Sequence, residues 1–175
     1  MKSRGEQGFT LIELLIVVAI ISIIAAIAVP GLLRARMTGN ESSAIASLRT
    51  TTSSQVSYSA ACGNGAYAPT YDQLADPPPG APNSQGFISA EFNAPAPILK
   101  SGYELTLTDG GAAEGPPDCN IQATAADFYA IAEPQNHGST GTRSFAVDAN
   151  MTIFQNDTDT APTYPVAASG GTPIN

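Results

Sequence analysis

The longest apolar run of the chain lies close to its N-terminus. Residues 11–29 are all apolar except Glu13 and Ser22. As an α-helix this run is about 28 Å long, close to the hydrocarbon thickness of a bilayer. Beyond residue 30 the chain becomes polar and rich in Ser, Thr, Gly, Pro and Ala. The pattern therefore predicts one membrane-spanning segment followed by a soluble domain.

Helical periodicity continues past the apolar run. Pro30 follows it and either kinks the helix or ends it at the membrane surface. Apolar residues then return near helical spacing, which favours a kink. They are Leu32, Leu33, Ala35, Met37, Ala44, Ile45, Leu48, Val56 and Ala60. We predict one long helix over about residues 9–61 with a bend at Pro30. Residues 50–54 are Thr and Ser, so their helicity must come from packing.

Strand-like patterns appear in the second half of the chain. Residues 103–108 alternate apolar and polar side chains, and 127–132, 143–148 and 151–154 are further candidates. The tail from residue 158 is rich in Pro, Gly and Ala and is expected to be irregular. The order predicts an α+β fold, in which three to four antiparallel strands pack on the second half of the helix.

Charge is distributed unevenly along the chain, whose net charge is −8. Lys2 and Arg4 precede the apolar run and favour a cytoplasmic N-terminus, whereas Arg34 and Arg36 oppose this orientation. The soluble domain is acidic, which argues against a phosphate-binding surface, so no nucleic acid partner is expected. Solubility is the simplest role for this acidity.

The two cysteines, Cys62 and Cys119, both follow the apolar run. An even pair beyond a membrane segment suits a disulfide in an oxidising compartment. Two free buried thiols or part of a metal site are the alternatives, although no neighbouring His or Cys supports a metal.

Residue patterns of catalysis and cofactor binding are lacking in the sequence. The single histidine, His137, lies in a Gly/Ser/Thr-rich turn without a plausible catalytic set. Asp148, Asn150, Asp157 and Asp159 lack the glycine and terminal glutamate of a calcium loop. No phosphate-binding loop, dinucleotide fingerprint or zinc spacing is found. We predict no enzymatic activity, no cofactor and no metal site.

The motif Gly8-Phe9-Thr10-Leu11-Ile12-Glu13, the apolar run and Pro30 lie together in residues 5–30. This segment resembles the class III signal of type IV pilins and type II secretion pseudopilins. The resemblance implies that a prepilin peptidase cuts between Gly8 and Phe9 and then methylates the new amine of Phe9. Residues 1–8 are then a cleaved leader, 9–30 a transmembrane and filament-core helix, and 31–175 the rest of the helix with a pilin-fold globular domain.

Glu13 is a carboxylate within the apolar run, where a charge costs about 3 kcal/mol on insertion scales. It either reaches interfacial water or pairs with a cation such as the amine of Phe9, its own or a neighbour's. The resemblance assigns Glu13 to assembly. In related filaments the helix partly melts before the proline, here Pro30, and Ser22 stands where a glycine is usual.

The function expected from the resemblance is that of a structural subunit in a type IV pilus-like filament. The alternatives are a pseudopilin of a type II secretion system and a minor pilin for adhesion or DNA uptake. Its expected partners are further copies of itself, a prepilin peptidase and an inner-membrane assembly machinery. Before assembly the chain would cross the inner membrane once, and afterwards it would lie in a surface pilus or a periplasmic pseudopilus.

Overall fold

The computed structural model describes residues 8–80 and 85–174. Helix α1 runs from Leu11 to Ala61 without interruption and contains Pro30. The chain divides into two compact units, Met1–Arg36 and Met37–Asn175, with the boundary inside α1. A single long helix was predicted over about residues 9–61, and the observed helix confirms it.

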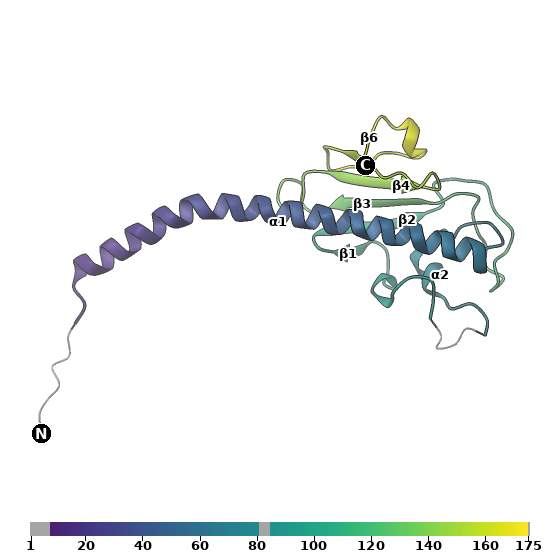
Figure 1. Ribbon diagram of the computed structural model, residues 1–175, viewed down its shortest axis with the longest axis horizontal. Helices are drawn as coiled ribbons and strands as arrows, with labels where there is room; N and C mark the ends of the chain where they lie inside the picture. Colours follow the sequence, from purple (N-terminus) through teal and green to yellow (C-terminus); the bar gives the residue numbers. More distant parts are fainter. Residues whose placement is uncertain (1–7, 81–84, 175) are drawn as a thin grey trace, which may run out of the picture. The chain divides into compact units, whose positions relative to one another are not determined.

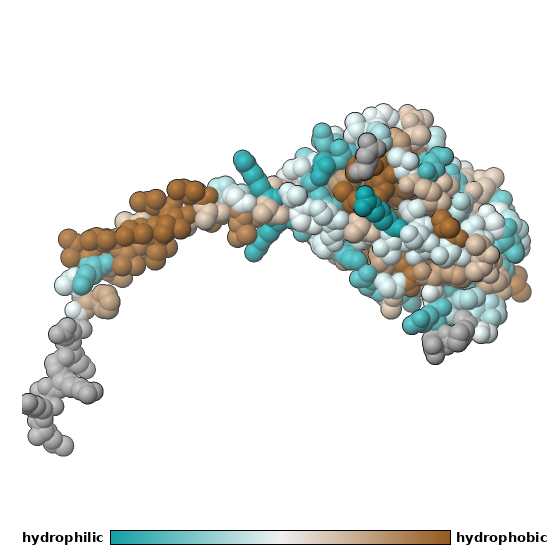
Figure 2. Space-filling model, in the orientation of Figure 1, coloured by the Kyte–Doolittle hydropathy of each residue, from teal (hydrophilic) through white to brown (hydrophobic). Residues whose placement is uncertain are grey.

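The described part of the first unit is almost entirely the apolar half of α1. Every residue from Gly8 to Arg36 is exposed, so this helix buries none of its apolar side chains within the unit. Figure 2 shows most of it as a hydrophobic surface, with hydrophilic atoms near its two ends. By length and composition alone, α1 qualifies as a membrane-spanning helix. A helix that is apolar all round is typically surrounded by lipid or by other protein.

The second unit contains an antiparallel sheet, with six strands among the described residues, ordered β1-β2-β3-β4-β5-β6. Each strand pairs with its neighbour in sequence, forming a meander (Figure 1). The strands are β1 (Ile98–Lys100), β2 (Tyr103–Thr108), β3 (Tyr129–Pro134), β4 (Ser144–Asp148), β5 (Phe154–Asn156) and β6 (Thr172–Pro173). The α+β class with a long helix on an antiparallel sheet is confirmed. The expected count of three to four strands was wrong.

The two unforeseen strands lie at the edges of the sheet. β1 is three residues long, too short for alternation to be recognised. It joins β2 through Ser101 and Gly102, whose φ values of 49° and 74° suit a two-residue hairpin turn. β6 lies in the tail that was expected to be irregular, and Pro173 is tolerated there because an edge strand need not donate every N–H.

Three predicted strands begin later than expected. β4 begins one residue late, at Ser144, whereas β3 and β5 begin two and three residues late because side chains and turns occupy their first residues. The Asp127 carboxylate accepts hydrogen bonds from the N–H groups of Phe128 and Ala149, and β3 begins only at Tyr129. Met151 N–H donates to the Asp148 carbonyl in a turn, and β5 begins only at Phe154.

The core of the second unit lies between one face of α1 and the sheet (Figure 1). Leu48 and Tyr58 of α1 are buried in the same cluster as Tyr103, Leu105 and Phe145 of the strands. The short helix α2 (Tyr71–Ala75) and the 3₁₀ turn Ala90–Phe92 also contribute to this cluster. A second 3₁₀ turn, Val166–Ala168, packs with Ala146 and Ala161 in a smaller cluster.

Polar residues on α1 are buried without being left unsatisfied. Thr51 Oγ1 donates to the Ser47 carbonyl one turn earlier and also hydrogen bonds with Tyr71. The Gln55 amide both donates to and accepts from the backbone of Ala68. These partners satisfy the buried side chains, and packing rather than intrinsic propensity supports the helix in this Ser/Thr-rich stretch.

Candidate processing and assembly site

The predicted cleavage position lies immediately before α1. Gly8 and Phe9 are both exposed, and the Phe9 side chain is 89% accessible. A Cβ added at Gly8 would meet no atom within 4 Å, so packing within the chain does not require a glycine here. Residues 1–7 of the predicted leader lie outside the described residues. The accessible Gly8-Phe9 bond suits recognition by another protein, and cleavage there stays a prediction.

Glu13 has a role at the start of α1 that sequence analysis missed. Glu13 Oε2 accepts from the Thr10 N–H at 2.9 Å and from the Thr10 hydroxyl at 2.6 Å, while Glu13 N–H donates to Thr10 Oγ1 at 3.3 Å. This reciprocal arrangement is a capping box, which satisfies helix N–H groups that lack intrahelical partners. The spacing Thr-x-x-Glu before an apolar run is its sequence signature and was available in Thr10–Glu13.

Pro30 lies inside α1 and is exposed. Because proline has no N–H, it cannot donate to the carbonyl of Ala26, four residues earlier. One turn before that, the Ser22 hydroxyl donates to the Val18 carbonyl at 2.7 Å, a type of bond that often bends helices. The backbone hydrogen bonding of α1 is thus weakened in this segment, while the role of Pro30 in assembly stays a prediction.

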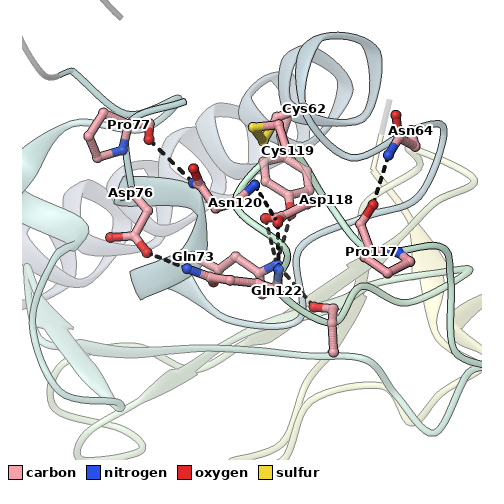
Figure 3. Close-up of a disulfide and its surroundings, with 12 residues drawn as sticks. Cys62, Asn64, Gln73, Asp76, Pro77, Pro117, Asp118, Cys119, Asn120 and Gln122 are labelled. Atoms are coloured by element: carbon pink, nitrogen blue, oxygen red, sulfur yellow. Dashed lines mark hydrogen bonds between the residues drawn. A yellow bond between two sulfur atoms is a disulfide. The ribbon is translucent and has the colours of Figure 1, made fainter. Parts of the chain in front are cut away.

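Cys62 and Cys119 form the expected disulfide in the second unit, with Cα atoms 4.8 Å apart. Figure 3 shows that it lies beside a buried polar network. Asp118 Oδ2 accepts from the Tyr58 hydroxyl at 2.7 Å and from Gln73 Nε2 at 3.1 Å. The disulfide and this network join the end of α1 to the loop that precedes β3.

Both ionisable members of this network are perturbed. Burial, followed by the nearby Asp118, raises the pKa of the Tyr58 hydroxyl above its ordinary value. Burial alone would raise the pKa of Asp118, but hydrogen bonds from Gln122, Tyr58, Gln73 and Asn120 hold it below its ordinary value. The network therefore stabilises a carboxylate paired with a neutral phenol.

A second network ties α1 to the residues just before β4, and the sequence pattern did not indicate it. Glu41 Oε2 accepts from Arg143 Nε at 3.0 Å and Nη2 at 2.6 Å. Glu41 Oε1 accepts from the N–H and hydroxyl of Thr142 at 2.9 and 3.0 Å. Arg143 Nη1 also donates to Gln155 of β5. Because these residues are about a hundred positions apart, no local pattern indicates their pairing.

The remaining candidate residues are divided between the two units of the chain. The predicted processing and assembly residues Gly8, Phe9, Glu13 and Pro30 belong to the first unit, while both cysteines belong to the second. His137 is exposed and its Nε2 lies 3.1 Å from the Thr142 carbonyl oxygen. Across residues 8–80 and 85–174, no group of three or more His, Cys, Asp or Glu side chains could hold a metal ion.

Comparison with known proteins agrees with the N-terminal motif. Residues 3–29 match the family model described as the prokaryotic N-terminal methylation motif. A 38-residue segment is 60% identical to the type IV wide pilus major component PilA4 of Thermus thermophilus. That match covers 22% of this chain and 29% of the relative. No solved structure matches the chain. In its N-terminal segment, therefore, the chain carries a prokaryotic methylation motif and resembles the type IV pilins.

Proposed function

We propose that the chain is a structural subunit of a type IV pilus-like filament, made as a membrane-anchored precursor. A prepilin peptidase removes residues 1–8 by cutting between Gly8 and Phe9 and methylates the amine of Phe9. Residues 9–30 cross the inner membrane before assembly and form the filament core afterwards. Residues 31–175 supply the rest of the helix and the globular domain.

One observation carries this proposal: the apolar half of α1 is exposed on every side. Its large apolar side chains between Phe9 and Leu33 are 44–89% accessible. Burying such a side chain contributes about 1.5–3 kcal/mol, so the segment has a strong tendency to enter lipid or to pack against other copies. A membrane satisfies it before assembly, and neighbouring helices replace the lipid in a filament.

The relative favours a major subunit over the alternatives. PilA4 is described as the major component of a wide pilus, and it is 60% identical to this chain over 38 residues. We therefore propose an abundant filament subunit rather than a pseudopilin or a minor pilin. Electron microscopy of sheared surface fractions tests this. We expect long filaments composed of this chain, whereas their absence together with a secretion defect on deletion would indicate a pseudopilin.

Processing is tested by mass spectrometry of the assembled chain. We expect its first residue to be Phe9 with a methylated amine. Gly8→Ala should leave the globular domain folded, because a Cβ at Gly8 meets no atom within 4 Å, and should block cleavage. Normal cleavage of Gly8→Ala would contradict the assignment of this bond.

Glu13 offers a sharper test, because the capping box separates its structural role from its charge. Gln at this position retains the capping geometry, whereas Ala removes both the cap and the charge. If Glu13 pairs with an amine of Phe9 to set the register between subunits, Glu13→Gln and Glu13→Ala should both be processed yet fail to assemble. Normal filaments from Glu13→Gln would show that only the cap matters. Thr10→Val serves as the control that loses the cap and keeps the charge.

A further inference from the structure

Ile121 has an unusual backbone and an unusual environment. Its φ is 63°, in the left-handed region, and its side chain is 88% exposed. A β-branched residue is disfavoured there, whereas Gly, Asn and Asp are tolerated. An apolar side chain on a strained backbone that contacts almost nothing reduces the stability of the folded chain. A contact with another molecule would account for keeping such a residue at this position.

The loop that carries Ile121 is rigid. Asp118 N–H donates to the Gln122 carbonyl, and the Asp118 carboxylate accepts from the N–H groups of Asn120 and Gln122. The disulfide of Cys119 closes the loop from its other side (Figure 3). Because the loop is already ordered before binding, less conformational entropy is lost when Ile121 contacts a partner.

An acidic side chain accompanies Ile121. Gln122 Nε2 donates to Asp76 Oδ2 at 2.8 Å, which holds that carboxylate next to the loop. Asn120 Nδ2 donates to the carbonyl of Pro77 at 3.3 Å. The tip therefore presents one apolar side chain with a carboxylate beside it, and Asp76 is exposed.

Another surface of the second unit combines apolar side chains with a cation, and so complements the apolar side chain and the carboxylate at the loop tip. Two hollows of about 480 and 390 Å³ flank the exposed side of α1 and share Arg49 and Ile174. Ile45, Met151 and Ile153 add apolar lining. Within the part of the chain that the structure describes, Arg49 makes no hydrogen bond or ion pair. We call this surface the Arg49 groove.

We propose that Ile121 and Asp76 of one copy dock in the Arg49 groove of another copy, as a lateral contact that rests on the proposed filament function. Ile121 enters the apolar part of the groove, and the Asp76 carboxylate meets the unpaired Arg49. Two different surfaces of the same chain that fit each other make a heterologous contact. Such a contact propagates along a filament when its rotation does not close into a ring.

The test uses the full chain expressed in cells that assemble it, with filaments sheared from equal cell numbers and quantified by immunoblot. Ile121→Asn removes the apolar tip and suits a left-handed backbone. We expect a melting temperature at or above the wild-type value and about tenfold fewer filaments. Leu99→Asn is the matched control, since Leu99 is 62% exposed on the edge strand β1 and does not have a positive φ. It should leave filament amounts unchanged.

Charge reversal tests the pairing. Asp76→Arg and Arg49→Asp should each reduce filament amounts, and the double variant should restore them. Failure of the double variant to recover while it melts like the wild type would overturn the contact. Unchanged filament amounts from Ile121→Asn would also overturn the contact, even if those filaments no longer bind a foreign surface. A wild-type chain that forms no filaments would overturn the proposed function and this contact with it.

Discussion

Replacing Glu41 by alanine removes the carboxylate that joins α1 to the segment just before β4. Four hydrogen bonds end on this carboxylate, two from Arg143 and two from Thr142. The Glu41 side chain is 7% exposed, and that of Arg143 is 32% exposed. After the substitution Arg143 retains Gln155 as a partner, whereas the Thr142 N–H is left without its acceptor.

The magnitude follows from the burial of the two partners. Breaking a fully buried ion pair costs about 3–5 kcal/mol, because the remaining charge is left unpaired. Arg143 is about a third exposed, so water partly replaces the carboxylate, and we expect a loss of about 2–3 kcal/mol. For a domain of this size such a loss lowers the melting temperature by about 5–10 °C.

Thermal unfolding of the purified full chain in mild detergent measures this loss. Glu41→Gln, which keeps the shape and one acceptor, should lose about 1–2 kcal/mol. Glu114→Gln is the control, since Glu114 is exposed and its side chain has no partner among the described residues. A Glu41→Ala melting temperature within 1–2 °C of the wild type, about the effect of 0.5 kcal/mol, would refute the reasoning.

The same pair gives a pH dependence. Burial alone would raise the pKa of Glu41, but hydrogen bonds from Thr142 and Arg143 hold it below the ordinary value of 4.5. A carboxyl whose pKa is lowered by folding stabilises the fold above its unfolded pKa and loses this contribution as pH falls through the folded pKa. The stability advantage of the wild type over Glu41→Gln should therefore shrink below about pH 4.5. A constant difference down to pH 3 would contradict the assignment.

Three further predictions concern the second unit, each measured by thermal unfolding of the full chain. Cys62→Ala with Cys119→Ala should cost about 4 kcal/mol, because the disulfide closes a loop with a sequence separation of 57. Glu104→Thr should stabilise the sheet by about 0.5 kcal/mol, since Glu104 lies opposite Glu133 in the β2–β3 pair; a lower melting temperature would contradict this. Leu48→Ala should cost about 3 kcal/mol, because Leu48 is fully buried between α1 and the sheet.

Long periodic segments were predicted well from the sequence. The end of α1 at Ala61 and the bounds of β2 at Tyr103 and Thr108 match the expected residues. The edge strands β1 and β6 were not predicted, because two or three residues carry no measurable alternation. The Ser101-Gly102 turn is the local signal that could have indicated β1.

Contacts between distant segments account for what was missed at the candidate sites. Glu41 and Arg143 each look like an exposed surface charge in sequence, and only folding brings them together. Ile121 was unremarkable within its loop, because a backbone dihedral is set by the surrounding turn and disulfide rather than by the residue itself. The Thr10–Glu13 capping box, by contrast, was fully encoded in four neighbouring residues.

The edges of the sheet have a consequence for molecules held at high local concentration. An open strand edge exposes unpaired N–H and C=O groups, to which a strand of another molecule can add. Here one edge is the three-residue β1, and the other is the two-residue β6, which includes Pro173. Both edges are too short to template much pairing. Crowded copies of this domain are therefore protected against amyloid-like aggregation, and their association depends on side chains rather than on shared sheets.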